Sequence, residues 1–375
     1  MDYRKRSFRL MAMLMCLLCL SVSTYGSKKQ KKKKKSKTEM AAKDSLSANK
    51  PKTIPTVAKF ITPAAKAHKG MVNIYEQNDK FFMEIPQTLM GRDIFVFVSL
   101  IKGSAQEKRS ANDFMGYGGD ALYSKTIRFA NGPKDKVFLH EPIFTTMMPN
   151  KDSQLYGAVQ ASSLMPIAAA FDVKAKSDST VVIDITDMYK SDHPYFSLKG
   201  ASETLNTGAY QADRSYPTTV STYANNVIFR SIRSYAEGKP KKTSATAKPV
   251  KQNPTIWEVA SSWYLLPEEP MRPRYFDNRV GYFATSVNDY TRTPEKAVLT
   301  TFVNRWRLEP RPEDVEKMRR GELVEPLKPI VYYIDPATPN QWRKYLIAGI
   351  NDWQKAFEKA GFKNAIIGKE WPEND

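Results

Sequence analysis

Short apolar runs, rich in β-branched and aromatic residues, recur between Phe60 and Val303 and limit the fold more than any other feature of the sequence. Their apolar positions do not recur every three or four residues, as those of an amphipathic helix do. The runs typical of strands are residues 80–86, 93–101, 126–129, 137–139, 180–185, 227–232 and 255–266. The run 93–101 is apolar at both alternating sets of positions, which predicts burial on both faces. The pattern predicts an antiparallel, β-rich region with short loops.

Two turn-rich segments lie between these runs. Residues 131–135 (NGPKD) separate two of them and predict a hairpin. Residues 238–254 (GKPKKTSATAKPVKQNP) are of low complexity and interrupt two further strand-like runs. We interpret this second segment as a disordered loop between paired strands, not as a domain border.

The pattern changes after Leu327. Pro329–Asp335 is a continuous apolar run of the kind that forms strands buried on both faces. Thr338 and Gln341 match the two ends of a capping box, and Pro339 lies where proline suits the start of a helix. We therefore expect a strand followed by a helix that begins at this point.

An apolar stripe at steps of three and four residues follows, which predicts an amphipathic helix of about 20 residues. Its members are Trp342, Leu346, Ile350, Trp353, Phe357 and Ala360. Gly361 suits the left-handed conformation that ends many helices, with Phe362 folding back on Phe357. Residues 364–367 begin another apolar run, so the segment predicts one strand-helix-strand unit. The fold class expected for the whole chain is therefore α+β.

The N-terminus has the three parts of a secretory signal peptide. Four basic residues among the first nine precede the apolar run Leu10–Val22, and small residues follow at Thr24 and Gly26. The run is shorter than the roughly 20 apolar residues that span a bilayer, so we expect export and cleavage near Gly26. An uncleaved membrane anchor remains an alternative. Lipoprotein cleavage before Cys16 or Cys19 is another, although neither cysteine follows a small residue.

The positive charge of the chain is concentrated at its N-terminal end. The formal net charge is +19, but residues 1–52 hold 15 Lys and Arg against 3 Asp and Glu. Residues 27–55 combine these lysines with few large apolar residues, so we expect a disordered tether. The tether is either a solvated spacer or a contact to an anionic envelope surface. No aromatic residues alternate with the lysines and the rest of the chain is only mildly basic, which argues against specific nucleic-acid binding.

Cysteine and histidine are scarce, with two and three residues. This excludes a disulfide scaffold, a cysteine-rich zinc ribbon and a metal site built from several histidines. His140-Glu141 fails as the start of a zinc-binding H-E-x-x-H helix, because Phe144 replaces the second histidine and Pro142 interrupts a helix. We expect His140 to end the strand at 137–139. The sequence predicts no catalytic, cofactor-binding or metal-binding residue.

Two weaker motifs have structural interpretations. Residues 116–120 (GYGGD) lack the lysine of a phosphate loop, and we expect a turn. Asp184, Asp187 and Asp192 lack the intervening glycine of an EF-hand, and caps at a strand end explain them.

An arginine-rich segment leaves two interpretations open. Arg272, Arg274 and Arg279 lie close in sequence to Asp277. They either grip a carboxylate group of a ligand or form an ion-pair network within a proline-rich loop.

Three longer motifs carry a resemblance to a known family. They are LLP at 265–267 with MRPRYFDNRVGYF at 271–283, RWRLE at 305–309, and PIVYYIDPATP at 329–339 with GFKNAI at 361–366. These stretches resemble a family of large exported bacterial zinc-dependent metalloproteases. The last stretch looks like the opening strand and helix of the family's catalytic domain, which is similar to metzincins. The resemblance extends from about Phe60 to the end, and it is strongest after Leu265. In the part before Leu265, the resemblance implies two domains of uncharacterised function.

The resemblance also implies what this chain lacks. Family members carry H-E-x-x-H-x-x-G-x-x-H downstream of that helix, and no such motif occurs up to Asp375. No catalytic or metal residue is therefore carried over, and zinc belongs to the complete family members. The resemblance implies the N-terminal portion of an exported metallopeptidase that is inactive as it stands. The alternative is a non-enzymatic, exported, β-rich binding module at the cell envelope.

The expected organisation follows from these parts. It comprises a signal peptide at 1–26, a Lys-rich tether at 27–55, a small N-terminal domain at 56–103, a β-rich domain at 104–303 with the loop 238–254, a Pro-rich connector at 304–328 and the truncated start of a metzincin-like catalytic domain at 329–375. We expect localisation in the periplasm, at the cell envelope or outside the cell. A protein or peptide is the substrate that the family implies.

Overall fold

The structure is a computed structural model. It describes residues 53–105, 115–144, 146–147, 151–152, 154–240, 253–293 and 296–372. The expected signal peptide, nearly all of the tether and residues 241–252 of the expected loop lie outside these ranges. Within them, no helix has the length and apolar character that crossing a membrane requires.

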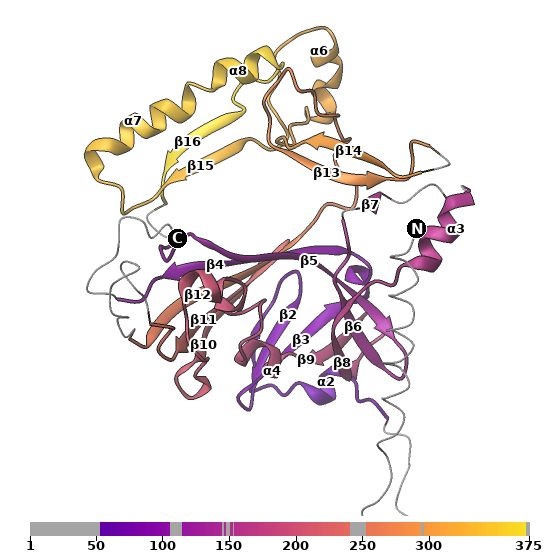
Figure 1. Cartoon of the computed structure of the whole chain (residues 1–375), viewed down its shortest axis with the longest axis vertical. Coiled ribbons are helices and arrows are strands. Elements are labelled where there is room, and N and C mark those ends of the chain that lie inside the picture. The colour runs from indigo at the N-terminus through magenta and orange to yellow at the C-terminus, as the bar shows by residue number, and fades with distance from the viewer. Residues whose placement is uncertain are drawn as a thin grey trace, which may run out of the picture. The chain divides into compact units, whose positions relative to one another are not determined.

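An antiparallel sheet dominates the part of the chain that the structure describes (Figure 1). Its eleven strands lie in the order β1-β2-β3-β9-β8-β6-β5-β4-β12-β11-β10. Their bounds are β1 Lys66–His68, β2 Asn73–Gln77, β3 Lys80–Pro86, β4 Asp93–Lys102, β5 Ala121–Gly132, β6 Lys136–His140, β8 Ile167–Lys176, β9 Thr180–Asp184, β10 Tyr216–Thr222, β11 Asn226–Tyr235 and β12 Thr255–Leu265. Every pair of neighbours is antiparallel.

The two ends of this sheet nearly meet. The amide of Met71, between β1 and β2, donates a 2.7 Å hydrogen bond to the carbonyl of Tyr223, just after β10. A Cβ atom on Gly70 would lie 2.6 Å from that same carbonyl oxygen, so the close approach requires glycine. The sheet therefore closes almost completely on itself, which covers most of its exposed edge.

The core lies on the inner face of the nearly closed sheet. On β4, Ile94, Val96, Val98 and Leu100 are all fully buried, whereas the residues between them are only half-buried. The expectation that both faces of this strand are buried was therefore wrong for the outer face. Alternation of this kind is typical of an antiparallel sheet with one face packed on a core.

The segment that follows β9 fills the space enclosed by the sheet. It contains α4 (Thr186–Lys190), η2 (Leu198–Ala201) and α5 (Ser202–Leu205). Tyr189 and Phe196 from this segment belong to the main hydrophobic core. The ring centroid of Phe196 lies 5.6 Å from that of Trp263, which is buried on β12. Aromatic packing thus links the inserted segment to the strands around it.

Further elements lie outside the large sheet. The strands are β7 (Thr146–Met147), β13 (Ala284–Asp289) and β14 (Val298–Val303), which form one sheet, and β15 (Ile330–Ile334) and β16 (Ile366–Glu370), which form another. The helical elements are α2 (Val57–Phe60), η1 (Gln87–Leu89), α3 (Gln154–Ser162), η3 (Ala212–Arg214), η4 (Pro312–Asp314), α6 (Val315–Arg319), α7 (Asn340–Asn351) and α8 (Gln354–Lys359). The fold is mixed α+β, and few of its residues are helical.

Several predictions from the sequence are confirmed. β5 and β6 form the expected hairpin, and β11 pairs with β12 across the expected loop. β15 and β16 are parallel neighbours joined by helices, as in one strand-helix-strand unit (Figure 1). This unit alone does not identify a metzincin fold.

The helix of this unit differs from the expectation at its start and in its middle. It consists of α7 and α8, which are separated at Asp352–Trp353. The capping box is not formed, because the N-cap residue is Pro339 and not Thr338, and no side chain caps the helix there. Asp335 orders the turn instead, as its Oδ1 accepts a 2.7 Å hydrogen bond from the amide of Ala337.

The predicted helix end is confirmed. Gly361 has a φ of 95°, in the left-handed region. The amide of Phe362 donates to the carbonyl of Phe357 at 2.9 Å, and the amide of Gly361 donates to the carbonyl of Glu358 at 3.0 Å. This is the Schellman pattern of hydrogen bonds.

Candidate functional site

His140 and Glu141 lie where β6 ends, as the sequence predicts for His140. The carboxylate of Glu141 accepts a hydrogen bond from the hydroxyl of Tyr195 and forms an ion pair with Lys125 at 3.2 Å. Burial raises the pKa of Tyr195, and its bond to Glu141 raises it further. Burial lowers the pKa of His193, and the charge of Glu141 opposes that shift. These contacts anchor the segment after α4 to the sheet.

Metal-binding geometry is absent from the ranges that the structure covers. No group of three or more His, Cys, Asp or Glu side chains is arranged there to hold a metal ion. His68 instead pairs with Glu76 at 2.8 Å on neighbouring strands.

The glycine-rich segment at 116–120 forms the expected turn. The carboxylate of Asp120 accepts hydrogen bonds from the amides of Gly116 at 2.6 Å and Tyr117 at 2.7 Å. These amides would have to face a phosphate group in a phosphate loop. The side chain of Asp120 occupies that place instead.

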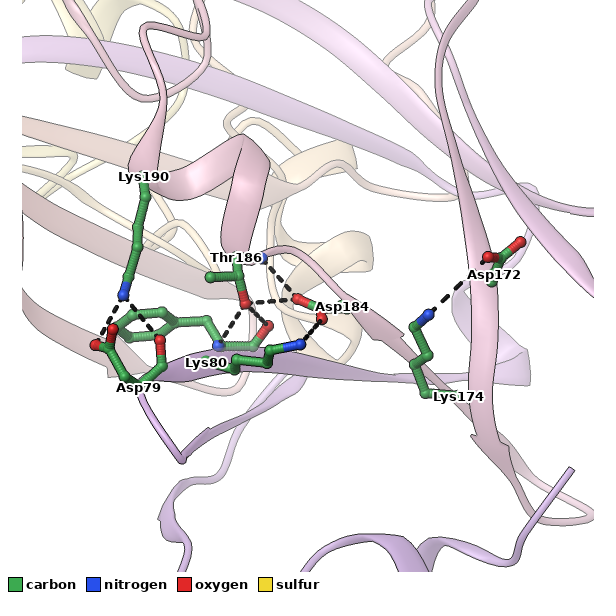
Figure 2. A network of polar contacts seen from close by, with 8 residues as sticks. Asp79, Lys80, Asp172, Lys174, Asp184, Thr186 and Lys190 are labelled. Carbon is green, nitrogen blue, oxygen red and sulfur yellow. Dashed lines mark hydrogen bonds and ion pairs between the residues drawn. The ribbon is translucent and has the colours of Figure 1, made fainter. Parts of the chain in front are cut away.

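Of the three aspartates predicted around α4, Asp184 belongs to a structural network beside the β2–β3 turn (Figure 2), and Asp187 lies in the first turn of α4. Asp184 accepts hydrogen bonds from the amide and the hydroxyl of Thr186, and it lies 3.6 Å from the ammonium group of Lys80. Lys190 pairs with Asp79 at 2.7 Å. The carboxylates of Asp184 and Asp79 thus each have a cation or a cap as partner, which supports the structural interpretation.

Asp192 makes contacts outside that network. Its carboxylate accepts a 2.7 Å hydrogen bond from the hydroxyl of Tyr235 on β11. Burial and this bond raise the pKa of Tyr235. Asp192 therefore fixes the inserted segment to the sheet.

The arginine-rich segment after β12 forms a cavity of about 580 Å³. We call it the arginine pocket, and its lining includes Met271, Arg272, Arg274, Tyr275, Arg305 and Leu308. Arg279 is not part of this lining, and its Nε and Nη2 donate hydrogen bonds to the carboxylate of Asp277 at 2.9 and 2.6 Å. Of the two interpretations of the segment, the ion-pair network thus applies to Arg279 alone.

Arg305 is the member that sequence reasoning missed. Residues 274–276 run beside β14: the amide of Val303 donates to the carbonyl of Arg274 at 3.0 Å, and that of Phe276 donates to Thr301 at 2.9 Å. This pairing brings Arg305, which follows β14, next to Arg272, whose carbonyl accepts a 2.8 Å hydrogen bond from it. In the sequence, the sign of Arg305 is a second basic motif, RWRLE, about thirty positions after Arg272.

The pocket carries unbalanced positive charge. Glu309, the acidic residue in its lining, lies 2.9 Å from Arg307, which is outside it. Among the residues with described positions, no carboxylate lies within ion-pair distance of Arg272, Arg274 or Arg305. Three guanidinium groups are therefore available to a ligand.

An apolar groove of about 610 Å³ lies on the strand-helix-strand unit. Its lining includes Trp306, Tyr332, Tyr345, Leu346, Trp353 and Phe357. Tyr345 is 61% exposed and Trp353 is 63% exposed, so large aromatic rings face solvent. The expected apolar stripe is therefore mostly uncovered: Ile350 and Phe357 are half-buried, whereas the other four members are exposed, namely Trp342, Leu346, Trp353 and Ala360.

The exposure follows from where the helix packs. A Cβ atom on Gly368 of β16 would lie 3.1 Å from the Cα of Ile347, so the backbone of α7 lies directly over β16. On the face of β15 that Tyr332 shares with Ile330 and Ile334, the two isoleucines are buried, whereas Tyr332, which lines the groove, is exposed. One helix thus covers one strand of the pair and leaves apolar surface uncovered over the other.

Comparison with known proteins finds two family models and no named relative. Residues 54–103 match the domain of unknown function DUF5118, and residues 119–311 match the domain of unknown function DUF5117. No curated protein and no solved structure matches the chain. Strands from both matched ranges belong to the same eleven-stranded sheet. Because the match to residues 119–311 covers half of the 375-residue chain, the chain belongs to the family of proteins that carry the domain of unknown function DUF5117.

Proposed function

We propose that the chain is the non-catalytic N-terminal portion of an exported zinc-dependent metallopeptidase and has no peptidase activity by itself. The apolar groove carries this proposal. It lies on the segment whose sequence resembles the opening of a metzincin-like catalytic domain. In the proposal, later elements of that domain pack into the groove and complete it.

The geometry of the strand-helix-strand unit supports this reading. β15 and β16 form a parallel pair, and parallel sheets are stable when both faces are covered. A two-stranded sheet is marginal without further strands or helices. Burying a large apolar side chain contributes roughly 1.5–3 kcal/mol, and several such side chains are exposed here. A covering partner would therefore stabilise the unit considerably.

The chemistry of hydrolysis would come from outside this chain. A zinc peptidase needs protein ligands that leave one coordination position open and a base that activates water. In the proposal these groups and the zinc ion belong to the downstream peptidase domain, which acts on a protein or peptide substrate. In the proposal the N-terminal signal peptide directs the protein to the periplasm, the cell envelope or the outside of the cell.

The test compares the 375-residue chain with an extended one. The coding sequence that follows the codon for Asp375 is read, and the chain is expressed with and without it. We expect an in-frame or frameshifted H-E-x-x-H motif, about one zinc per extended chain and casein cleavage that a chelator abolishes. Zinc-dependent cleavage by the 375-residue chain, or an unrelated gene in the following sequence, would refute the proposal.

The second candidate function is a non-enzymatic binding module of the cell envelope. The arginine pocket favours it, because unbalanced guanidinium groups in a cavity are suited to an anionic ligand. The same reading of the downstream sequence separates the two functions, since only the first requires a zinc motif.

A further inference from the structure

We propose that the arginine pocket binds an acidic peptide segment, with carboxylate groups on the guanidinium groups of Arg272, Arg274 and Arg305. This inference stands independently of the peptidase proposal. It concerns a different surface and needs no zinc.

The charges of the pocket indicate that its ligand is negatively charged. Arg272 and Arg274 are exposed, Arg305 is half-buried, and none of the three has a carboxylate partner in the described part of the chain. Neighbouring arginines show that partners are used where they exist, since Arg279 binds Asp277 and Arg307 binds Glu309. Like charges held together repel one another, and a bound anion removes that repulsion.

The side chains of the pocket identify the chemical group. A guanidinium group presents a planar fork of donors that matches a carboxylate with two parallel hydrogen bonds. The backbone that carries these forks is held in place: Arg274 pairs with β14 through its carbonyl, and Arg305 donates to the carbonyl of Arg272. The donors are therefore partly ordered before a ligand arrives, which lowers the entropic cost of binding.

The apolar wall distinguishes a peptide from a bare inorganic anion. Met271, Tyr275 and Leu308 share the cavity with the arginines. The ring of Tyr275 stacks on Phe302 with centroids 5.5 Å apart, and Arg292 lies over the same ring at 5.3 Å. The apolar surface of these side chains gains contact area from a ligand that has hydrocarbon next to its carboxylates. The cavity volume is also within the range of about 300–1,000 Å³ of ligand sites.

Binding is measured by fluorescence anisotropy with a labelled, N-acetylated and C-amidated peptide of alternating glutamate and leucine. The full chain is used at about 150 mM salt to limit long-range attraction. The Lys-rich segment near the N-terminus also attracts acidic peptides, so the result is the difference between variants that all retain it. The matched variants are Arg274→Gln, Arg305→Gln and Arg279→Gln, and near-ultraviolet circular dichroism checks that each is folded.

We expect Arg274→Gln and Arg305→Gln to weaken peptide binding about tenfold or more each, because each removes a charge-assisted bidentate contact. Arg279→Gln should stay within about twofold of the parent chain, since that arginine is outside the pocket. A peptide with glutamine in place of glutamate should not bind. The proposal is overturned if all three variants weaken binding equally, if the glutamine peptide binds as well, or if inorganic phosphate displaces the peptide at equal concentration.

Discussion

Arg233 is a charged side chain in the interior of the nearly closed sheet. It lies on β11 with no exposed surface. Its guanidinium group donates to the carbonyls of Tyr189 at 2.5 Å, Lys190 at 3.3 Å and Phe196 at 3.0 Å, and to the hydroxyl of Tyr210 at 2.9 Å. Tyr189 and Lys190 end α4, where helix carbonyls have no partner within the helix. A cation at this end also complements the helix dipole.

Replacing Arg233 with methionine should lower the free energy of unfolding by about 3 kcal/mol, because several buried carbonyls lose their donor at once. Arg230→Met on the same strand is the matched control, since Arg230 is exposed. It should change that free energy by less than about 0.5 kcal/mol. Urea unfolding measures both. Equal effects of the two substitutions would show that the buried hydrogen bonds have no special weight.

Glu84 joins three strands through its carboxylate. It is buried on β3 and accepts hydrogen bonds from Asn73 at 2.8 Å and Tyr75 at 2.8 Å on β2, and from Thr180 at 2.7 Å on β9. Burial raises the pKa of Glu84, but the bonds from Asn73, Thr180 and Tyr75 lower it more, so its pKa lies below the ordinary 4.5. Burial and then the Glu84 carboxylate raise the pKa of Tyr75 to about 12.

The lowered pKa gives a pH-dependent prediction for Glu84→Gln. The unfolded chain binds a proton at Glu84 more readily than the folded chain, so this stabilisation is present above pH 4.5 and is lost as the pH falls through the folded pKa. At pH 7 the substitution should lower the free energy of unfolding by about 2 kcal/mol. The difference between variant and parent should shrink near pH 3. Unfolding in urea at both pH values, with the exposed Glu203→Gln as control, checks this, and a difference independent of pH would contradict it.

Among the elements, the helix pair α7–α8 depends on two glycines with opposite requirements. Gly361 has a φ of 95°, and a Cβ there would lie 3.1 Å from the side chain of Met318. Gly349 lies inside α7, and a Cβ there would have no neighbour within 4 Å. The first position therefore requires glycine, whereas the second only loses helix stability by having it.

Alanine substitutions at the two glycines should consequently change the stability of the helix pair in opposite directions. Gly361→Ala should lower the opening free energy of α7 and α8 by about 1 kcal/mol or more. Gly349→Ala should raise it by about 0.5–1 kcal/mol. Hydrogen exchange of the helix amides measures this local opening. A loss of stability in both variants would argue against the helix geometry described here.

The elements that could be predicted from the sequence are those with local signals. β3 and the β5–β6 hairpin follow from β-branched runs and turn residues, and Gly361 ends the helix as predicted. β8 was missed because its run of alanines is not typical of strands, and it is held by pairing with β6 and β9. The Thr338 cap failed because the helix begins one residue later, with Pro339 at its N-cap.

The candidate site was harder to predict than the fold, because it depends on contacts between distant residues. Arg272 and Arg274 could be identified from their spacing, and Asp277 offers a partner to Arg279 only two residues away. The pairing of residues 274–276 with β14 brings Arg305 to the pocket, and Asp277 removes Arg279 from it. The register between strands depends on contacts between distant residues, and a single sequence indicates it only weakly.

At the scale of the whole molecule, two kinds of packing occur in one chain. The large sheet closes almost completely and encloses a continuous core that contains buried aromatic residues such as Trp263 and Phe229. The strand-helix-strand unit has a smaller cluster of Val324, Phe362 and Ala365, and its apolar groove faces solvent. The two parts should therefore differ in local stability, because protection follows buried apolar contact.

The connector between these parts packs on the unit. The amide of Lys363 donates to the carbonyl of Val324 at 3.0 Å, and the amide of Val324 donates to the carbonyl of Gly361 at 3.2 Å. Met318 of α6 packs against the same small cluster. Residues 304–328 thus contribute to the folding of the unit, while its groove remains open.

Hydrogen exchange of residues 346–357, in the 375-residue chain and in the chain extended by its downstream coding sequence, tests the central claim most directly. In the shorter chain these amides should exchange far faster than those of β4 at 95–100. In the extended chain they should slow by about 100-fold, as the groove is covered, and Leu346→Lys should reverse most of that gain. If the exchange of residues 346–357 is the same in both chains, or already as slow as that of β4 in the shorter one, the groove is not where a peptidase domain packs.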